Sequence, residues 1–313
     1  MRMRFLLALL KFFSFFAADT RVENDLKNVA DIPARFTGYD RGAWELKKTS
    51  QGDYSYFEIA GPSPDAPVLV MIHGLSLDGR TFAHLSSLSA YFRLLAINLP
   101  ETSPLYTGRL SDFCTILSQW LAEAGVDRFH LAGCSFGGII AQHIAAGCLK
   151  DRIQSVTLLA SYIPGYNKSD IRNLSFRAET FRTLSDTRMF WMMELLRKRA
   201  LRSVSRSGKY DIKNIIFQRP PYYARQVLES MYRYSGIDAA KAIDIPVLQV
   251  HGSKDQALPK KKARETLKYF KHIKYCEIPG GGHSFVYEDA KELIPLMLRF
   301  YSSNAIIKPN EVQ

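Results

Sequence analysis

Three residues that together can activate a hydroxyl group occur in separate glycine-containing segments of the chain. Ser135 stands in GCSFG at 133–137, Asp255 follows the apolar run VLQVHG closely, and His283 follows three glycines at 280–282. A serine hydroxyl is a weak nucleophile until a base accepts its proton, and an imidazole oriented by a carboxylate is such a base. The chain order predicts Ser135 as nucleophile, His283 as base and Asp255 as orienting acid.

The segment around Ser135 has the pattern G-x-S-x-G between the apolar run FHLAG and the helix-like run GGIIAQHIAAG. In that context the pattern is typical of a sharp strand-to-helix turn with the serine at its apex. Gly133 and Gly137 are needed there, because side chains at the flanks would collide with the neighbouring strand and helix. The alternative is a chance match in a glycine-rich loop, and the flanking runs favour the functional interpretation.

A second glycine turn offers hydrogen-bond donors for the same chemistry. His73-Gly74-Leu75 closes the apolar run VLVMIH, and Gly74 lets the backbone turn so that the next amide can face a substrate oxygen. We predict that the backbone N–H groups of Leu75 and Phe136 form an oxyanion hole, the second aided by the positive end of its helix. The structural alternative is a glycine that only ends a strand.

The elements that must position these residues alternate regularly. Most apolar, β-branched runs are continuous, as expected for parallel strands covered on both faces, and amphipathic stretches separate them. The expected strands are 54–60, 68–73, 93–98, 129–133, 155–160, 247–251 and 274–279, and the expected helices are 81–91, 111–124, 136–149, 260–270 and 287–301. This alternation predicts an open α/β sheet whose functional sites lie at the ends of strands.

Residues 162–242 interrupt the alternation with a helical pattern, and we interpret them as an insertion. From 161 to 242 the chain has 16 Lys and Arg against 7 Asp and Glu, within a net charge of +12 for the whole chain. The basic run 197–202 favours an anionic partner, either a membrane surface or an acyl-carrier protein, with a solvated surface as the alternative. Nucleic acid is not expected, because no nucleic-acid-binding motif accompanies the charge. The apolar run 189–196 is compatible with an acyl pocket or with ordinary packing.

Composition excludes several classes of protein. With 47% hydrophobic and 23% charged residues among 313, the chain is globular rather than disordered. No uninterrupted apolar run reaches the length of a membrane-spanning helix. The four cysteines form no C-x-x-C pair, so neither a disulfide framework nor a zinc site is expected, and Cys134 and Cys148 are interpreted as small buried thiols. No metal and no cofactor is expected.

Residues 1–20 begin with MRMR and continue with an apolar stretch at 5–18 that Lys11 interrupts. As a helix this stretch would span about 21 Å, which is short of the hydrocarbon core of a membrane. Three interpretations stay open: a signal peptide, a helix lying in the membrane surface, and a helix packed on the domain. The chain is accordingly exported, membrane-associated or cytoplasmic.

With these motifs in this order, residues 40–302 resemble the α/β-hydrolase superfamily, in its capped serine esterase and lipase branch. AGCSFGGIIAQ and KDQAL show a weaker similarity to maspardin, an atypical relative. The resemblance implies a mostly parallel, eight-stranded α/β-hydrolase sheet flanked by helices. It places the two parts of the hydrolase core at 40–161 and 243–302, a helical, basic cap at 162–242 and a tail at 303–313.

The resemblance also implies an activity, that of a carboxylesterase or lipase-like enzyme. Such an enzyme would cleave an ester of a medium or long acyl chain through an acyl-enzyme on Ser135. A thioesterase or an acyltransferase would use the same residues, and a non-catalytic hydrolase scaffold that only binds a partner is the rival from another class. Related epoxide hydrolases and haloalkane dehalogenases are disfavoured, because they need an aspartate where Ser135 stands.

Overall fold

The structure is a computed structural model, and it describes residues 35–37, 43–49, 55–75, 77–99, 109–186, 230–231, 233–234 and 236–307. The expectations for residues 1–20, for the runs 189–196 and 197–202, and for the last six residues of the tail lie outside the described residues. Within the described ranges, no helix combines the length and the apolar character that crossing a membrane requires.

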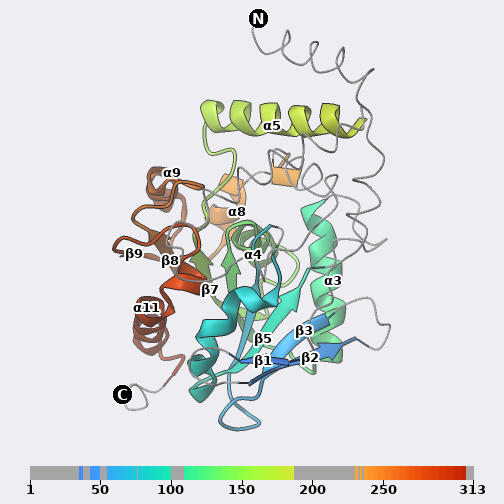
Figure 1. The fold of residues 1–313 in the computed structure, drawn as a ribbon, viewed down its shortest axis with the longest axis vertical. Helices are drawn as coiled ribbons and strands as arrows, with labels where there is room; N and C mark the ends of the chain where they lie inside the picture. The colour runs from blue at the N-terminus through green and yellow to red at the C-terminus, as the bar shows by residue number, and fades with distance from the viewer. Residues whose placement is uncertain are drawn as a thin grey trace, which may run out of the picture.

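The described strands form one sheet of nine, in the order β1-β2-β3-β5-β4-β6-β7-β8-β9 (Figure 1). Their bounds are β1 Arg35–Thr37, β2 Ala43–Lys48, β3 Ser55–Ile59, β4 Val68–Ile72, β5 Arg93–Asn98, β6 Phe129–Cys134, β7 Ile153–Leu159, β8 Val247–Gly252 and β9 Ile273–Ile278. β3 is antiparallel to β2 and β5, and every pair from β5 to β9 is parallel. Strands β2 to β9 confirm the expected mostly parallel fold, and the short β1 extends its antiparallel edge.

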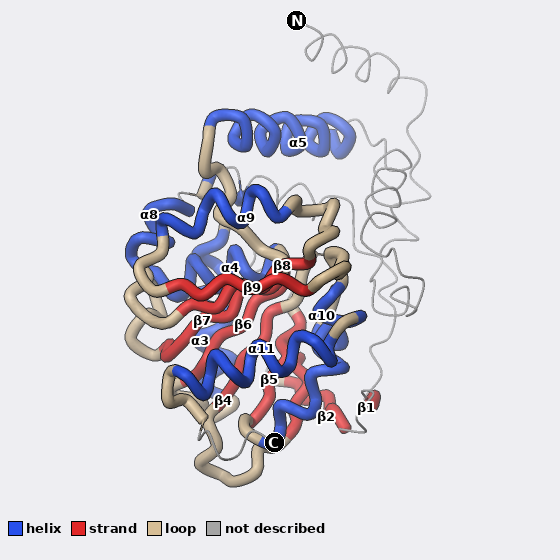
Figure 2. The backbone as a smooth tube through the Cα atoms, turned by 90° about the vertical axis from the view of Figure 1, so that its left-hand side faces the viewer, coloured by secondary structure: helices blue, strands red, loops and turns tan. Residues whose placement is uncertain are grey.

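Helices cover both faces of this sheet. Consecutive residues of β4 show why, because Leu69 and Met71 pack into one apolar cluster while Val70 and Ile72 pack into the other. One cluster includes α3, α4 and α8, and the other includes η1, α10 and α11, which crosses in front of the sheet in Figure 2. The bounds are η1 Gly79–Ala90, α3 Leu110–Glu123, α4 Phe136–Ala146, α5 Lys168–Asp186, α8 Gly236–Ala242, α9 Lys260–Thr266, η3 Leu267–Tyr269, α10 Phe285–Glu288 and α11 Ala290–Ser303.

Local structure differs from the expectation in three places. The helix expected at 81–91 is a 3₁₀ helix, η1, and the one expected at 287–301 is divided at Asp289, whose φ of −121° and ψ of 37° are not helical. β2 was not among the runs read from the sequence. Its residues pass from buried Trp44 to exposed Lys47 instead of forming a continuous apolar run, and β2 belongs to the antiparallel part of the sheet, between β1 and β3.

The described part of the insertion is helical, and residues near the start of α5 contact the sheet domain. In both views α5 lies beyond α8, at the end of the molecule where β7 ends (Figures 1 and 2). Near the start of α5, the buried Asp170 carboxylate pairs with Lys262 of α9 at 2.6 Å. The same ammonium lies 5.0 Å from the centre of the Tyr162 ring. These contacts join the insertion to α9, while the domain boundaries and the role of a cap stay predictions.

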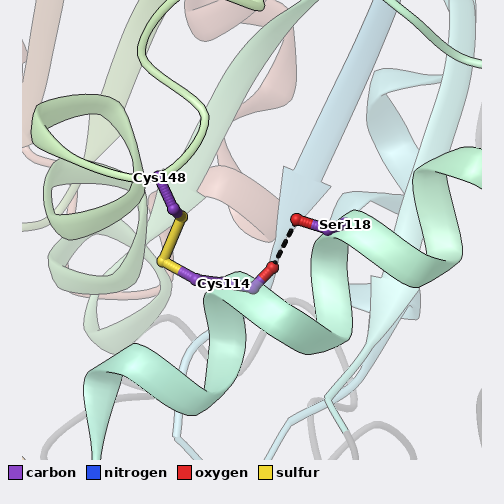
Figure 3. The surroundings of a disulfide bond; sticks show 3 residues. All are labelled: Cys114, Ser118 and Cys148. Atoms are coloured by element: carbon purple, nitrogen blue, oxygen red, sulfur yellow. Dashed lines mark hydrogen bonds between the residues drawn. A yellow bond between two sulfur atoms is a disulfide. The ribbon is translucent and has the colours of Figure 1, made fainter.

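The cysteines correct one expectation. Cys148 is not a free thiol but forms a disulfide with Cys114, whose Cα lies 6.1 Å away (Figure 3). The bond joins α3 to the segment that follows α4, and the sequence missed it because the partners lie 34 residues apart on elements that meet only in the fold. Cys134 is free and buried, as expected.

Candidate active site

Ser135 occupies the turn between β6 and α4 in a strained backbone conformation. Its φ is 53° and its ψ −114°, in the positive-φ region that residues with a side chain rarely adopt. The surrounding backbone holds it there, because the Ser135 N–H donates to the Leu159 carbonyl at 2.8 Å and the Ser135 carbonyl accepts the hydroxyl of Ser161 at 2.9 Å. The strain presents the hydroxyl outside the sheet, at the carboxyl end of β6.

The predicted glycines around Ser135 are required by close backbone approaches. A Cβ on Gly133 would overlap the backbone of Gly137, and a Cβ on Gly137 would overlap the carbonyl groups of Ile72 and His73. The strand, the turn and the first turn of α4 therefore fit together only without side chains at both positions. Gly138 is a third such position that the sequence analysis did not single out, since a Cβ there would meet Ser161 at 2.5 Å.

His283 brings the other two predicted side chains into one hydrogen-bonded series. Its Nε2 lies 3.0 Å from Ser135 Oγ and its Nδ1 lies 2.7 Å from Asp255 Oδ2. With the proton on Nδ1, His283 donates to the carboxylate and its Nε2 can accept the serine proton. The His283 side chain is 11% exposed and the Asp255 side chain is fully buried, so little water competes for these bonds.

Asp255 is surrounded by donors that keep its carboxylate ionised. Burial by itself would raise the pKa of this group, but hydrogen bonds from His251, from His283 and from the Leu258 N–H lower its pKa to about 2. The Leu258 N–H donates to Oδ1 at 2.9 Å, and His251 Nε2 lies 3.3 Å from Oδ2. At neutral pH Asp255 is therefore an anion that faces the His283 imidazole.

The loops that carry Asp255 and His283 are fastened to one another by their backbones. The Ser253 N–H donates to the Ile278 carbonyl at 3.0 Å, and the Lys254 N–H donates to the Gly281 carbonyl at 2.9 Å. Gly252 permits this approach, because a Cβ there would overlap the Gly281 carbonyl region. The glycines before His283 thus serve to dock its loop against β8, in addition to giving it reach.

The predicted oxyanion donors lie on the two backbone segments that meet beside Ser135. Phe136 is the first residue of α4, so its N–H has no carbonyl of the same helix to bond. Gly74 precedes Leu75 and lies against the turn, since a Cβ on it would stand 3.3 Å from Ser135 Cβ. The fully buried His73 fixes this loop: Nδ1–H donates to the Gly74 carbonyl at 2.8 Å, and Nε2 accepts the N–H of the residue after β5 at 3.0 Å.

Two residues of the site escaped the sequence analysis as functional positions, His73 and His251. Each precedes a glycine at the end of a strand, in the pair His-Gly, and that repeated pair was the available signal. Cys134, next to the serine, is not a competing nucleophile. Burial and the nearby Asp255 raise the pKa of its thiol to about 12, so it remains protonated at neutral pH. Within the described ranges, no group of three His, Cys, Asp or Glu side chains could hold a metal ion.

Comparison with known proteins gives a match at the level of fold and family. Residues 67–290 match the family model described as alpha/beta hydrolase fold. The chain is 25% identical over 272 residues to the dihydrolipoyllysine-residue acetyltransferase component of an acetoin cleaving system from Pseudomonas putida. That match covers 78% of this chain but 65% of that protein, which is less than two thirds of its length.

Two further similarities concern proteins named as ester-cleaving enzymes. The chain is 23% identical over 224 residues to the pimeloyl-[acyl-carrier protein] methyl ester esterase of Vibrio cholerae, a match that covers 67% of this chain and 83% of that protein. The crystal structure of a bacterial membrane phospholipase A superposes with a TM-score of 0.60 at 17% identity, and the match covers 96% of this chain and 93% of that one. The second likeness is one of fold.

Proposed function

This chain belongs to the α/β hydrolase family, and we propose that it is a serine hydrolase that cleaves a carboxylic ester, in the manner of carboxylesterases and lipases. The observation that carries the proposal is the hydrogen-bonded series from the Ser135 hydroxyl through the His283 imidazole to the Asp255 carboxylate. The strained conformation of Ser135 supports it, because such strain persists where the surroundings hold a functional group in place.

In the first half of the reaction, His283 Nε2 accepts the proton of Ser135 Oγ while Oγ attacks the ester carbonyl carbon. The carbonyl oxygen becomes an oxyanion, and the N–H groups of Leu75 and Phe136 stabilise its charge. The intermediate collapses by breaking the bond to the alcohol oxygen, which takes the proton from Nε2 and leaves as the alcohol. The acyl group is then bonded to Ser135 Oγ.

In the second half, a water molecule attacks the acyl carbonyl while His283 accepts one of its protons. The same two N–H groups stabilise the second oxyanion, whose collapse breaks the bond to Oγ and releases the carboxylic acid. The proton on Nε2 returns to Ser135. Asp255 stays ionised throughout, because it holds Nδ1–H toward itself and stabilises the positive imidazolium that forms in each half.

For the substrate we propose an ester with a medium or long acyl chain. Two similarities support this class: one relative is named for a pimeloyl methyl ester, and one structure of the same fold is a membrane phospholipase A. A thioesterase would differ only in its leaving group and an acyltransferase only in its second nucleophile. Rates on p-nitrophenyl esters and acyl thioesters of increasing chain length, with and without added alcohol, separate these activities.

A fluorophosphonate probe tests the proposed nucleophile directly. We expect covalent labelling of the wild type and none of Ser135→Ala. Ser118→Ala is the matched control, because it removes a hydroxyl that donates to the Cys114 carbonyl within α3 (Figure 3), and it should label like the wild type. Folded wild-type protein that takes up no probe would contradict the proposal and favour a binding module without catalysis.

We further propose that the chain works outside the cytosol at an anionic membrane surface, with an acyl-carrier protein as the alternative partner of a chain that stays in the cytosol. The Cys114–Cys148 disulfide supports an exported chain, because such bonds persist in oxidising compartments. The net charge of +12 and the basic, apolar start support binding to anionic lipid. Vesicle binding that weakens with salt and falls on deletion of residues 1–18 is expected, and binding unaffected by the deletion would contradict an anchor there.

A further inference from the structure

His251 is a second histidine on the carboxylate of Asp255, and the reaction steps above do not use it. It is the penultimate residue of β8 and is fully buried. Its Nε2 lies 2.7 Å from the Leu258 carbonyl oxygen and 3.3 Å from Asp255 Oδ2. His251 therefore contacts both the carboxylate and the peptide segment whose N–H bonds the other carboxylate oxygen.

The partners of His251 show which of its ring nitrogens carries a proton. A carbonyl oxygen only accepts, so Nε2 must carry a proton that points toward Leu258 and Asp255. Nδ1 is buried and has no hydrogen-bond partner among the described residues. A proton on Nε2 therefore satisfies the geometry, and His251 acts as a donor through that atom.

The two oxygens of the Asp255 carboxylate accept hydrogen bonds from different partners. Oδ2 accepts from His283 at 2.7 Å and faces the longer contact to His251, while Oδ1 accepts from the Leu258 N–H. The titratable groups around Asp255 are thus His283 from the loop after β9, His251 from β8 and the protonated thiol of Cys134 from β6. In the reaction steps proposed above, His283 is the group that accepts and returns the proton.

We propose that His251 is a positioning residue for the proposed hydrolase, which fixes the Asp255 carboxylate and moderates the negative charge that it presents to His283. This inference rests on the proposed function. By bridging the Leu258 carbonyl and Oδ2, His251 prevents the carboxylate from rotating away from Nδ1 of His283. By donating to Oδ2, it withdraws part of the negative charge that would otherwise stabilise the imidazolium.

Removal of the donor therefore has two separable consequences. In His251→Leu the carboxylate loses its support, and kcat should fall by roughly 10- to 100-fold, the range expected when a catalytic group is displaced slightly. The undivided charge of Asp255 also stabilises protonated His283 more strongly, so the acidic limb of the kcat/KM profile should move to higher pH. KM should change little, because His251 is not proposed to touch the substrate.

Two further variants give the experiment its controls. His251→Gln keeps an uncharged N–H donor at a similar reach, so it should restore most of kcat and the position of the acidic limb. His130→Leu removes another buried histidine, at the start of β6 and therefore at the opposite end of that strand from Ser135. It should reduce stability without moving the pH profile.

The outcomes are distinguishable from failure of the proposed function. If wild-type protein hydrolyses no ester and takes up no fluorophosphonate, the proposed function fails. If the wild type is active and His251→Leu keeps its kcat and pH profile, the positioning role fails. It fails equally if His251→Leu loses activity with an unmoved acidic limb and His251→Gln restores nothing, because His251 would then be needed only for packing.

Discussion

The two sides of the site are held together by different kinds of interaction. The side that carries Ser135, formed by β6, α3 and α4, is fixed by backbone contacts that exclude side chains and by the disulfide between α3 and the segment after α4. The side that carries Asp255 and His283, formed by the loops after β8 and β9, is fixed by hydrogen bonds to a buried charge and between backbones. We call them the nucleophile side and the acid–base side.

Because of this difference, we expect substitutions on the two sides to have different effects. Steric contacts and a covalent bond are insensitive to pH, so changes on the nucleophile side should act on folding and on the presentation of Ser135. Hydrogen bonds to a carboxylate depend on its charge, so changes on the acid–base side should act on proton transfer and on pH dependence. The following predictions test whether the two sides separate in this way.

The largest effect is expected for Asp255→Asn. An amide in this place can donate to Nδ1 of His283, which then presents its proton to Ser135 instead of a lone pair, and the analogous change in a Ser-His-Asp system lowers kcat roughly 10⁴-fold. The rate of ester hydrolysis measures this loss, and circular dichroism shows whether the fold persists. An unfolded Asp255→Asn protein would contradict the separation, because the acid–base side would then be essential for folding.

On the nucleophile side, Gly137→Ala should lower the free energy of unfolding rather than act directly on proton transfer. Its Cβ would overlap the carbonyl groups of Ile72 and His73, and because backbone cannot yield as a side chain can, the cost should be about 3 kcal/mol or more. Chemical denaturation measures the loss. Gly147→Ala is the matched control at the other end of α4, since its Cβ would come no nearer than 3.3 Å to the His143 carbonyl. Equal stability of the two variants would refute the steric account.

The sequence predicted the candidate catalytic residues and the parallel part of the sheet. Ser135, Asp255 and His283 were singled out because strand-end motifs are local, and the structure brings their side chains within hydrogen-bond distance. The continuous apolar runs of the central strands predicted the parallel part of the sheet, which the structure confirms. The catalytic roles of these residues stay predictions.

What the sequence did not reveal depends on distances between elements. The Cys114–Cys148 bond needs α3 to pack beside the end of α4, and no spacing rule relates a residue of α3 to one in the turn after α4. The contact of His251 with Asp255 depends on how tightly the loop after β8 turns back. β2 escaped because an antiparallel strand that ends in exposed Lys47 and Lys48 lacks the continuous apolar run of a central parallel strand.

The disulfide allows the nucleophile side to be weakened without altering its chemistry. The double variant Cys114→Ser, Cys148→Ser should lose about 2–4 kcal/mol of unfolding free energy, because the unfolded chain regains the freedom that the cross-link removes. Activity per folded molecule should be retained, since the bond lies at the end of α4 remote from Ser135. Cys276→Ser, which replaces a free cysteine, is the control. A large fall in kcat at full folding would show that the cross-link positions Ser135.

The smallest effect is a pH dependence that belongs to the acid–base side. The pKa of Asp255 is about 2 in the folded protein, because donated hydrogen bonds outweigh burial, against about 3.9 in an unfolded chain. The ionised carboxylate thus contributes stability that is complete above about pH 4 and is lost as the pH falls toward 2, a change of about 2 kcal/mol. Unfolding free energies of wild type and Asp255→Asn should therefore converge across that window.

Asp244, whose exposed carboxylate pairs with Lys271, also has a lowered pKa, but salt should remove its contribution and leave that of Asp255. A difference between wild type and Asp255→Asn that is constant from pH 6 to pH 2 would mean that the charge of Asp255 serves catalysis alone.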